Sequence, residues 1–255
     1  MFGYLGIHVI EREIIFIDIA LAQIAAVGST FALFIWHVEE NSFIAYLFAF
    51  GFTILASWFY SRVGRKITQI PIEAVIGVSY AIAAAAALFL IAIAAGGDIH
   101  MEHMLTGSIL WAKWSDIFLC AITFILVGIF HYIYREKFRK ISQDCRKAAE
   151  SGINTELWDF LFYITMGLVI TLSVKIAGVL VIFSFLIIPS TLAAMFSSSW
   201  KHRIGIAWLV GFLASVFGLA FSYRFDFSCG PSIVSFLGVA LIIAALIRKL
   251  KPTVV

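Results

Sequence analysis

Residues 135–157 read REKFRKISQDCRKAAESGINTEL, and this polar segment decides how the rest of the chain is organised. It carries six basic and four acidic side chains and lies between long apolar stretches. Over the whole chain 62% of residues are hydrophobic and 13% are charged, whereas about 25% of residues are charged in a soluble domain. The composition therefore predicts an all-α membrane protein whose spans are divided into two halves by this segment.

Eight stretches are long and apolar enough to be spans, since crossing a bilayer takes about 20 mostly apolar residues. They are residues 14–36, 43–60, 71–95, 115–134, 158–174, 176–196, 204–223 and 232–247. We therefore predict a polytopic membrane helical bundle of about eight spans, with residues 1–255 as a single transmembrane domain. The stretch at 158–174 is short, and it is expected to tilt little or to enter only partway. Residues 1–10 are too short to cross, and we expect the end of a longer helix or a short interfacial piece.

Basic residues gather on one side when the spans are threaded in alternation. Fifteen of the eighteen Lys and Arg residues fall on the side of the 135–157 segment, and the other side receives Lys113, Lys175 and Arg224. Short loops rich in Lys and Arg stay in the cytoplasm. The distribution therefore predicts a multi-pass protein of the cell (inner) membrane, with the 135–157 loop and the C-terminus in the cytoplasm.

Small residues form one stripe along the 204–223 span, at Gly211, Ser215, Gly218 and Ser222. Such stripes let the backbones of membrane helices approach closely. Packing within one subunit and contact between two copies are both open as explanations of this stripe.

Polar residues within the spans are candidates for a transport pathway, because such residues are costly in lipid and often functional. Asp18 lies roughly 7 Å beyond Glu13 and Gln23 about 15 Å beyond it, if this segment is helical at 1.5 Å per residue. Lining a pathway and hydrogen bonding between helices are both open for Gln23. Three further carboxylates near span ends are expected to be interfacial or capping residues: Glu73, Asp116 and Asp159.

A second candidate set, His100, Glu102 and His103, lies in the 96–114 loop on the side opposite to the basic segment. Imidazole and carboxylate groups suit zinc or manganese, so these residues could contact a divalent metal ion where it enters. A solvated loop with incidental histidines is the alternative.

Within the basic segment, residues 142–153 are predicted to form a short amphipathic helix. Its apolar positions recur every three or four residues, at Ile141, Cys145, Ala148, Ala149 and Ile153. Ser142 can cap its start, and Gly152 suits its C-terminal end. Outside the membrane such a helix has little to cover its apolar face unless a partner offers a groove. A helix that lies on the lipid surface is the alternative.

No motif for hydrolysis occurs in the sequence. The nucleotide-binding pattern GxxxxGK[ST], the GxSxG pattern and HExxH are all missing from it. We therefore expect that this chain is not an enzyme, and that another subunit supplies the energy if transport is active. We also expect neither a covalently bound cofactor nor a nucleic-acid partner.

Six segments that are spread over most of the chain form a set: IDIALAQI (17–24), MLTGSILW (104–111), KAAESGI (147–153), VKIAGVLV (174–181), LIIPSTLA (186–193) and SYRFDFSCGP (222–231). In this order and spacing they resemble the permease subunit of metal-ion ABC importers, a family that takes up zinc, manganese or iron. The resemblance implies an ATP-driven importer of a divalent metal ion or a metal chelate. It also implies a homodimer that works with two ATPase subunits and an extracytoplasmic substrate-binding protein.

The resemblance assigns roles to particular residues. The KAAESGI stretch corresponds to the family's ATPase-docking segment, and the candidate docking residues are Cys145, Ala148, Ala149, Gly152 and Ile153. Asp18 and Gln23 correspond to the metal path and become candidate metal contacts. The alternative class is a secondary transporter driven by an ion gradient, which would need coupling carboxylates near the midplane.

Two departures from the family pattern concern the N-terminal region. Members of the family begin with an additional helix, which this sequence is expected largely to lack. Their second helix carries GDxLxHA, and here Gln23 stands at the place of the His and Asp18 at the place of the Gly. A shift of one residue turns a side chain by about 100° around a helix, so the resemblance does not fix which metal is carried.

Overall fold

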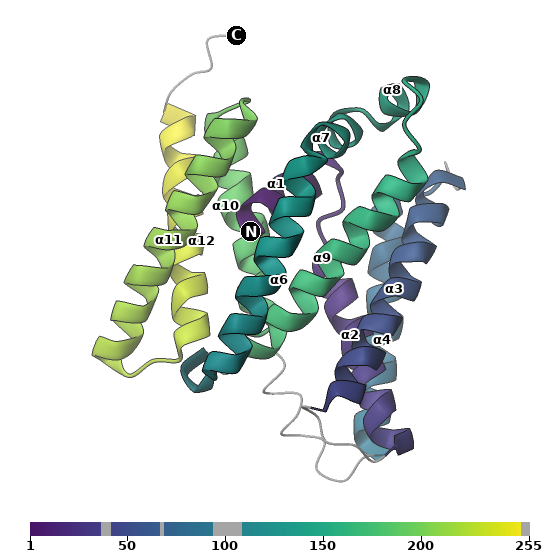
Figure 1. The fold of residues 1–255 in the computed structure, drawn as a ribbon. Helices are drawn as coiled ribbons and strands as arrows, with labels where there is room; N and C mark the ends of the chain where they lie inside the picture. Colours follow the sequence, from purple (N-terminus) through teal and green to yellow (C-terminus); the bar gives the residue numbers. More distant parts are fainter. Residues whose placement is uncertain (37–41, 67–68, 94–108, 251–255) are drawn as a thin grey trace.

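The computed structural model describes residues 1–36, 42–66, 69–93 and 109–250 (Figure 1). These parts are helical, and eight of their helices are long and apolar enough to cross a membrane, which confirms the predicted fold class. The helices are α1 (Phe2–Glu11), α2 (Ile17–Trp36), α3 (Phe43–Lys66), α4 (Ile72–Ile93), α6 (Trp114–Ile133), α7 (Arg135–Gln143), α8 (Cys145–Glu150), α9 (Thr155–Ala177), α10 (Val179–Phe196), α11 (Trp200–Phe225) and α12 (Cys229–Leu250), with a 3-10 turn at Ile109–Trp111.

Two groups of helices are joined through the diagonal helix α9. Helices α2, α3 and α4 pack together, and both α2 and α3 contact α9. Helices α10, α11 and α12 form the second group, and α1 packs on α10 and α11 (Figure 1). Helices α7 and α8 form a short pair, called here the α7–α8 hairpin (residues 135–150), at one end of the bundle.

The charge distribution over the two ends matches the predicted alternation of spans. The carboxyl end of α12 lies at the same end of the bundle as the α7–α8 hairpin, and so does the start of α11 with Lys201 and Arg203 (Figure 1). Lys113, Lys175 and Arg224 lie at the other end, where α6 begins and where α9 and α11 end. The structure therefore keeps most basic side chains of its described parts at one end.

Helix α9 corrects the prediction of a short span at 158–174. It runs over 23 residues, long enough to cross a bilayer at about 1.5 Å per residue. Gly178 alone separates it from α10, with φ at 81°, a left-handed conformation that glycine adopts without steric cost. The predicted turn at 174–176 is therefore displaced to Gly178.

Helix α1 is packed inside the bundle, so the expectation of a short interfacial piece for residues 1–10 is wrong. Its apolar side chains Leu5, Ile7 and Val9 are all buried. Gly6 lies directly against α10, where an added Cβ would overlap the Leu186 carbonyl oxygen and the Ser190 hydroxyl. The Ser190 hydroxyl also donates a hydrogen bond to the carbonyl of Gly3, at 3.1 Å. Close backbone approach, which only glycine permits, therefore holds α1 inside the bundle.

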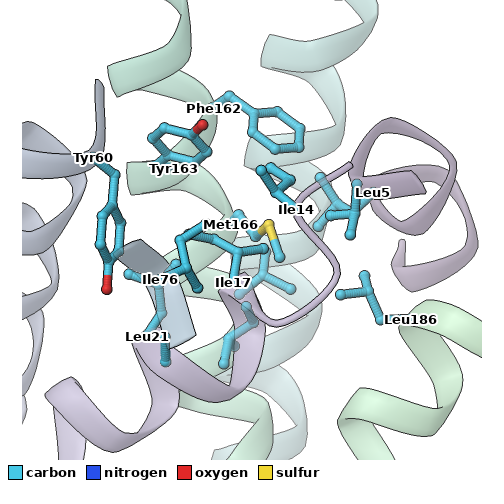
Figure 2. Packing of buried hydrophobic residues seen from close by; sticks show 14 of the residues in the cluster. Leu5, Ile14, Ile17, Leu21, Tyr60, Ile76, Phe162, Tyr163, Met166 and Leu186 are labelled. Atoms are coloured by element: carbon cyan, nitrogen blue, oxygen red, sulfur yellow. The ribbon is translucent and has the colours of Figure 1, made fainter. Parts of the chain in front are cut away.

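Helix α2 starts at Ile17, three residues later than the predicted span. Residues 12–16 connect α1 to α2 without forming a helix, and Glu13 in this link has a positive φ of 55°. Figure 2 shows Ile17 next to Met166, which is the middle residue of α9. The link therefore brings the chain from the hairpin end to about half the height of the bundle before α2 begins.

The main core surrounds this link. Leu5 of α1, Ile14 of the link and Leu186 of α10 meet Phe162 and Met166 of α9 in one buried cluster (Figure 2). The two helix groups are therefore packed together through α1 and the link that follows it.

The stripe of small residues on α11 packs within the chain. A Cβ on Gly218 would come within 2.6 Å of the backbone of Ile233 in α12, and a Cβ on Gly211 would lie 3.4 Å from the ring of Phe185 in α10. Of the two explanations that the sequence left open, the structure supports close packing of helices inside one subunit.

Candidate functional site

Asp18 is a buried carboxylate in the first turn of α2. Its side chain is only 2% exposed, and its Oδ1 atom has no hydrogen-bond partner among the described residues. The predicted depth of roughly 7 Å was wrong, because it assumed a continuous helix from Glu13 at 1.5 Å per residue. The non-helical link carries Asp18 to about half the height of α9 instead.

Glu73 of α4 faces the same region, which the sequence did not indicate. Its Oε1 atom accepts a hydrogen bond from the backbone N–H of Phe16 at 3.0 Å, and the carboxylate interacts electrostatically with Asp18. The prediction for Glu73 was an interfacial or capping residue, and this bond caps the start of α2 rather than that of its own helix. Two carboxylates at one helix start can contact a divalent cation, and the N-terminus of α2 also favours negative charge there. Within the described parts of the chain, no group of three or more His, Cys, Asp or Glu residues could hold a metal ion.

Of the other predicted metal contacts, Gln23 lies within the described residues, and it is not brought to this place. Gln23 is half-buried on α2, and five residues of helix turn it about 140° away from Asp18. His100, Glu102 and His103 lie outside the described residues. Asp116 is a capping residue, as predicted, since its carboxylate accepts from the backbone N–H of Lys113 at the start of α6.

The α7–α8 hairpin replaces the single helix predicted for residues 142–153. Asp144 has an extended conformation and divides the segment into α7 and α8. Asp144, and not Ser142, caps the second helix, by accepting a hydrogen bond from the backbone N–H of Lys147 at 3.0 Å. This bond lowers the pKa of the Asp144 carboxyl group. Gly152 takes the left-handed conformation predicted for the end of the helix, with φ at 81°.

The apolar face of the hairpin is covered by the bundle itself. Ala148 is only 3% exposed, and Cys145 and Ile153 pack against the main core. Ala148 is therefore not open for a partner, whereas Cys145 and Ile153 are half-buried and remain candidate docking residues. Ala149 and Gly152 are exposed, together with the charged residues Arg146, Lys147 and Glu150. A partner that binds the hairpin would therefore contact this mixed polar surface.

A cavity of about 500 Å³ separates part of the hairpin from the bundle. Its lining comes from α3, α4, α7, α8, α9, the end of α1 and the α1–α2 link, and includes Arg12, Tyr60, Ser142, Arg146, Ala149 and Asp159. The hairpin is therefore packed on the bundle along one part of its length and backed by open space along another.

A network of buried polar groups, which the sequence did not reveal, crosses the boundary between the hairpin and the bundle. The Arg12 guanidinium donates from Nη1 to Asp159 Oδ1 and from Nε to Ser142 Oγ, both at 2.8 Å. The Ser142 hydroxyl also bonds Nδ1 of His8, at 2.7 Å. The neighbouring Glu11 pairs with Arg203 and so ties α1 to α11.

Asp159 is thus part of a buried ion pair. The prediction that it is an interfacial or capping residue is therefore wrong. The signal in the sequence was the charged triplet of residues 11–13 next to apolar residues. Its partners on α7, α9 and α11 lie more than 100 residues away, and no local pattern could indicate them.

These features define a class of protein: a multi-pass helical membrane protein, with a buried carboxylate at the start of α2 and an exposed helical hairpin at the basic end. The chain belongs to the ABC 3 transport family, whose family model matches residues 1–248.

Two relatives and one solved structure illustrate the similarity. The chain is 25% identical to the high-affinity zinc uptake system membrane protein ZnuB of Haemophilus influenzae over 231 residues, covering 90% of this chain and 85% of ZnuB. It is 25% identical to the manganese transport system membrane protein MntC of Listeria innocua over 232 residues, covering 91% of this chain and 80% of MntC. The structure of PsaBC from Streptococcus pneumoniae in complex with Fab has the same fold, with a TM-score of 0.77, 23% identity and coverage of 95% of this chain and 85% of that chain.

Proposed function

We propose that this protein is the permease subunit of an ATP-driven importer for a divalent metal ion, zinc or manganese, with iron or a metal chelate as further candidates. The match to the ABC 3 transport family over residues 1–248 carries this proposal. Relatives that cover most of the chain are named for zinc and manganese transport, which supports a metal ion as the cargo. Family membership favours ATP-driven transport over the alternative of a gradient-driven secondary transporter.

The exposed surface of the hairpin is the proposed docking site for the ATPase subunit. Ala149 and Gly152, with Arg146, Lys147 and Glu150, project from the end of the bundle that carries most basic residues. This end is proposed to be cytoplasmic, because short basic loops are not translocated. The extracytoplasmic substrate-binding protein would then meet the opposite end, and two copies of the chain would form a homodimer.

Asp18, together with Glu73, is the proposed contact for the metal ion inside the bundle. Both carboxylates lie at the start of α2, and Asp18 is buried at about half the height of α9. Hard carboxylate oxygens suit manganese, and zinc also accepts them. Gln23, His100, Glu102 and His103 remain further candidates along the path.

The substitution Ala149→Asp is expected to abolish co-purification of the ATPase subunit with the permease. Ala149→Asp adds a charge to the exposed surface of α8, and a like or unpaired charge in an interface costs several kcal/mol, roughly a hundredfold or more in affinity. The measurement is a pull-down of the ATPase from co-expressing cells, with uptake of radioactive zinc and manganese. Ser228→Asp, which adds the same charge at the other end of the bundle, is the matched control. Full recovery of the ATPase with Ala149→Asp would contradict the docking proposal.

Neutralising Asp18 is expected to lower metal uptake by about tenfold or more while the ATPase remains bound, because a bond to a charged group is worth about 1.5–3 kcal/mol. Asp18→Asn keeps the shape of the side chain and removes the charge. Uptake of zinc and manganese by vesicles that contain the complete transporter measures the effect. Asp116→Asn, in the first turn of α6, is the matched control, because Asp116 caps its own helix. Equal uptake by wild type and Asp18→Asn would show that the carboxylate only supports the helix start.

A further inference from the structure

We infer that Arg12 is a positioning residue that couples the α7–α8 hairpin to the start of α2, so that movement of the hairpin is transmitted to Asp18. This inference rests on the proposed function, in which the ATPase acts on the hairpin.

Arg12 is held by three side chains from two other parts of the chain, α7 and α9. Its guanidinium bonds Ser142 at the end of α7 and Asp159 near the start of α9, and it lies 4.1 Å above the ring of Phe162. The side chain is only 7% exposed, so water competes little for these bonds. Arginine can make both bonds at once because its planar fork offers several donors in a fixed geometry.

The Ser142 hydroxyl is the point at which the hairpin joins this network. It accepts from Arg12 and also bonds Nδ1 of His8, one turn earlier on α1. Burial, together with the Arg12 guanidinium, lowers the pKa of His8 well below its usual value, so its imidazole stays neutral at pH 7. One hydroxyl on the hairpin therefore holds both the last turn of α1 and the first residue of the link.

The cavity behind the hairpin makes the hydrogen bonds among Arg12, Ser142 and Asp159 mechanically important. Packed interfaces transmit displacement through contact, whereas open space transmits nothing. Arg12, Ser142 and Asp159 all line the cavity of about 500 Å³ between the hairpin and the bundle. Hydrogen bonds at its wall therefore carry displacement across a region where apolar packing is incomplete.

On the other side of Arg12 the chain leads directly to Asp18. Arg12 is the first residue of the non-helical link, and α2 begins five residues later. The close contact of Gly6 with Leu186 and Ser190 prevents α1 from sliding along α10. A displacement of Ser142 would therefore be taken up by the link, which is not a regular helix, and would move the start of α2 with its buried carboxylate.

The decisive experiment measures metal ions transported per ATP hydrolysed, in vesicles that contain the permease, its ATPase and the substrate-binding protein, with zinc and manganese as probes. Ser142→Ala removes the hydroxyl and leaves the bond between Arg12 and Asp159 in place. It is expected to lower the transport ratio by at least about fivefold, the lower bound of typical coupling between sites, while the ATPase still co-purifies. Ser142→Thr keeps a hydroxyl beside the cavity and is expected to restore the ratio.

Two further variants make the test specific. Ser61→Ala, on the α3 wall of the same cavity, removes a hydroxyl that bonds the Trp58 carbonyl of its own helix, and it should leave the ratio unchanged. Arg12→Lys keeps a positive charge beside Asp159 but cannot make both bonds, and it should lower the ratio as Ser142→Ala does. A normal ratio in Ser142→Ala or Arg12→Lys would overturn the inference and leave the proposed function intact. Absence of an ATPase complex with the wild-type permease would overturn both.

Discussion

Replacing Gly6 with alanine is expected to displace α1 from α10 and to lower the free energy of unfolding by about 3 kcal/mol or more, at the upper end of the cost of overpacking. The added Cβ would overlap the Leu186 carbonyl oxygen, which belongs to the backbone of a buried helix and cannot turn away. The neighbouring Ser190 hydroxyl is also too close, and it already bonds Gly3. Helix α1 would have to shift as a whole, and the packing of Leu5 and Val9 would loosen.

Unfolding of the purified protein in mixed detergent micelles measures this effect. Gly205→Ala in α11 is the matched control, because no heavy atom of the described residues lies within 4 Å of a Cβ built there. This control should be neutral or stabilising by up to about 1 kcal/mol, since alanine favours a helix over glycine. Equal stability of the Gly6→Ala and Gly205→Ala variants would show that α1 does not sit against α10 as described.

Removing the Arg12 side chain is expected to have the second largest effect, a loss of about 2–4 kcal/mol in the free energy of unfolding. Arg12→Met takes the guanidinium away from the Asp159 carboxylate, whose side chain is 13% exposed. This partial exposure sets the expected loss slightly below the cost of breaking a fully buried ion pair. The Ser142 hydroxyl and the ring of Phe162 lose the same partner.

A second substitution separates the ion pair from the rest of the network. Arg12→Met combined with Asp159→Leu removes both charges, and replacement of a buried pair by apolar side chains of similar size is often neutral. The double variant is therefore expected to recover most of the stability in the same unfolding measurement. If it unfolds as easily as Arg12→Met alone, the charge of Asp159 is not the source of the loss.

Part of the candidate site could be predicted from residues close together in the sequence. Asp18 stood out as a charge in an apolar stretch, and Gly152 as the residue that ends a short helix. The partner of Asp18 could not be predicted, because Glu73 reaches α2 only through the packing of α4 against it. The depth predicted for Asp18 assumed a continuous helix from Glu13, and hydropathy does not show that residues 12–16 form an irregular link.

The hairpin shows where reasoning from periodicity fails. The spacing of Cys145, Ala148 and Ile153 correctly indicated one apolar face. Periodicity cannot say which surface covers that face, and the chain's own core covers it here. The extended residue Asp144 was also missed, since its capping role depends on a single backbone N–H three residues later.

The sequence by itself determined the helical membrane fold, its eight spans and the basic end of the bundle, because the hydrophobic effect and the cost of moving charges through lipid act on composition over about 20 residues. Only the tertiary structure decided that α1 is buried against α10, that α2 begins halfway through the bundle and that Arg12 joins α7 to α9. Contacts of this kind join residues more than 100 positions apart, and they depend on backbone approach and on hydrogen-bond geometry that exist only after the helices have packed.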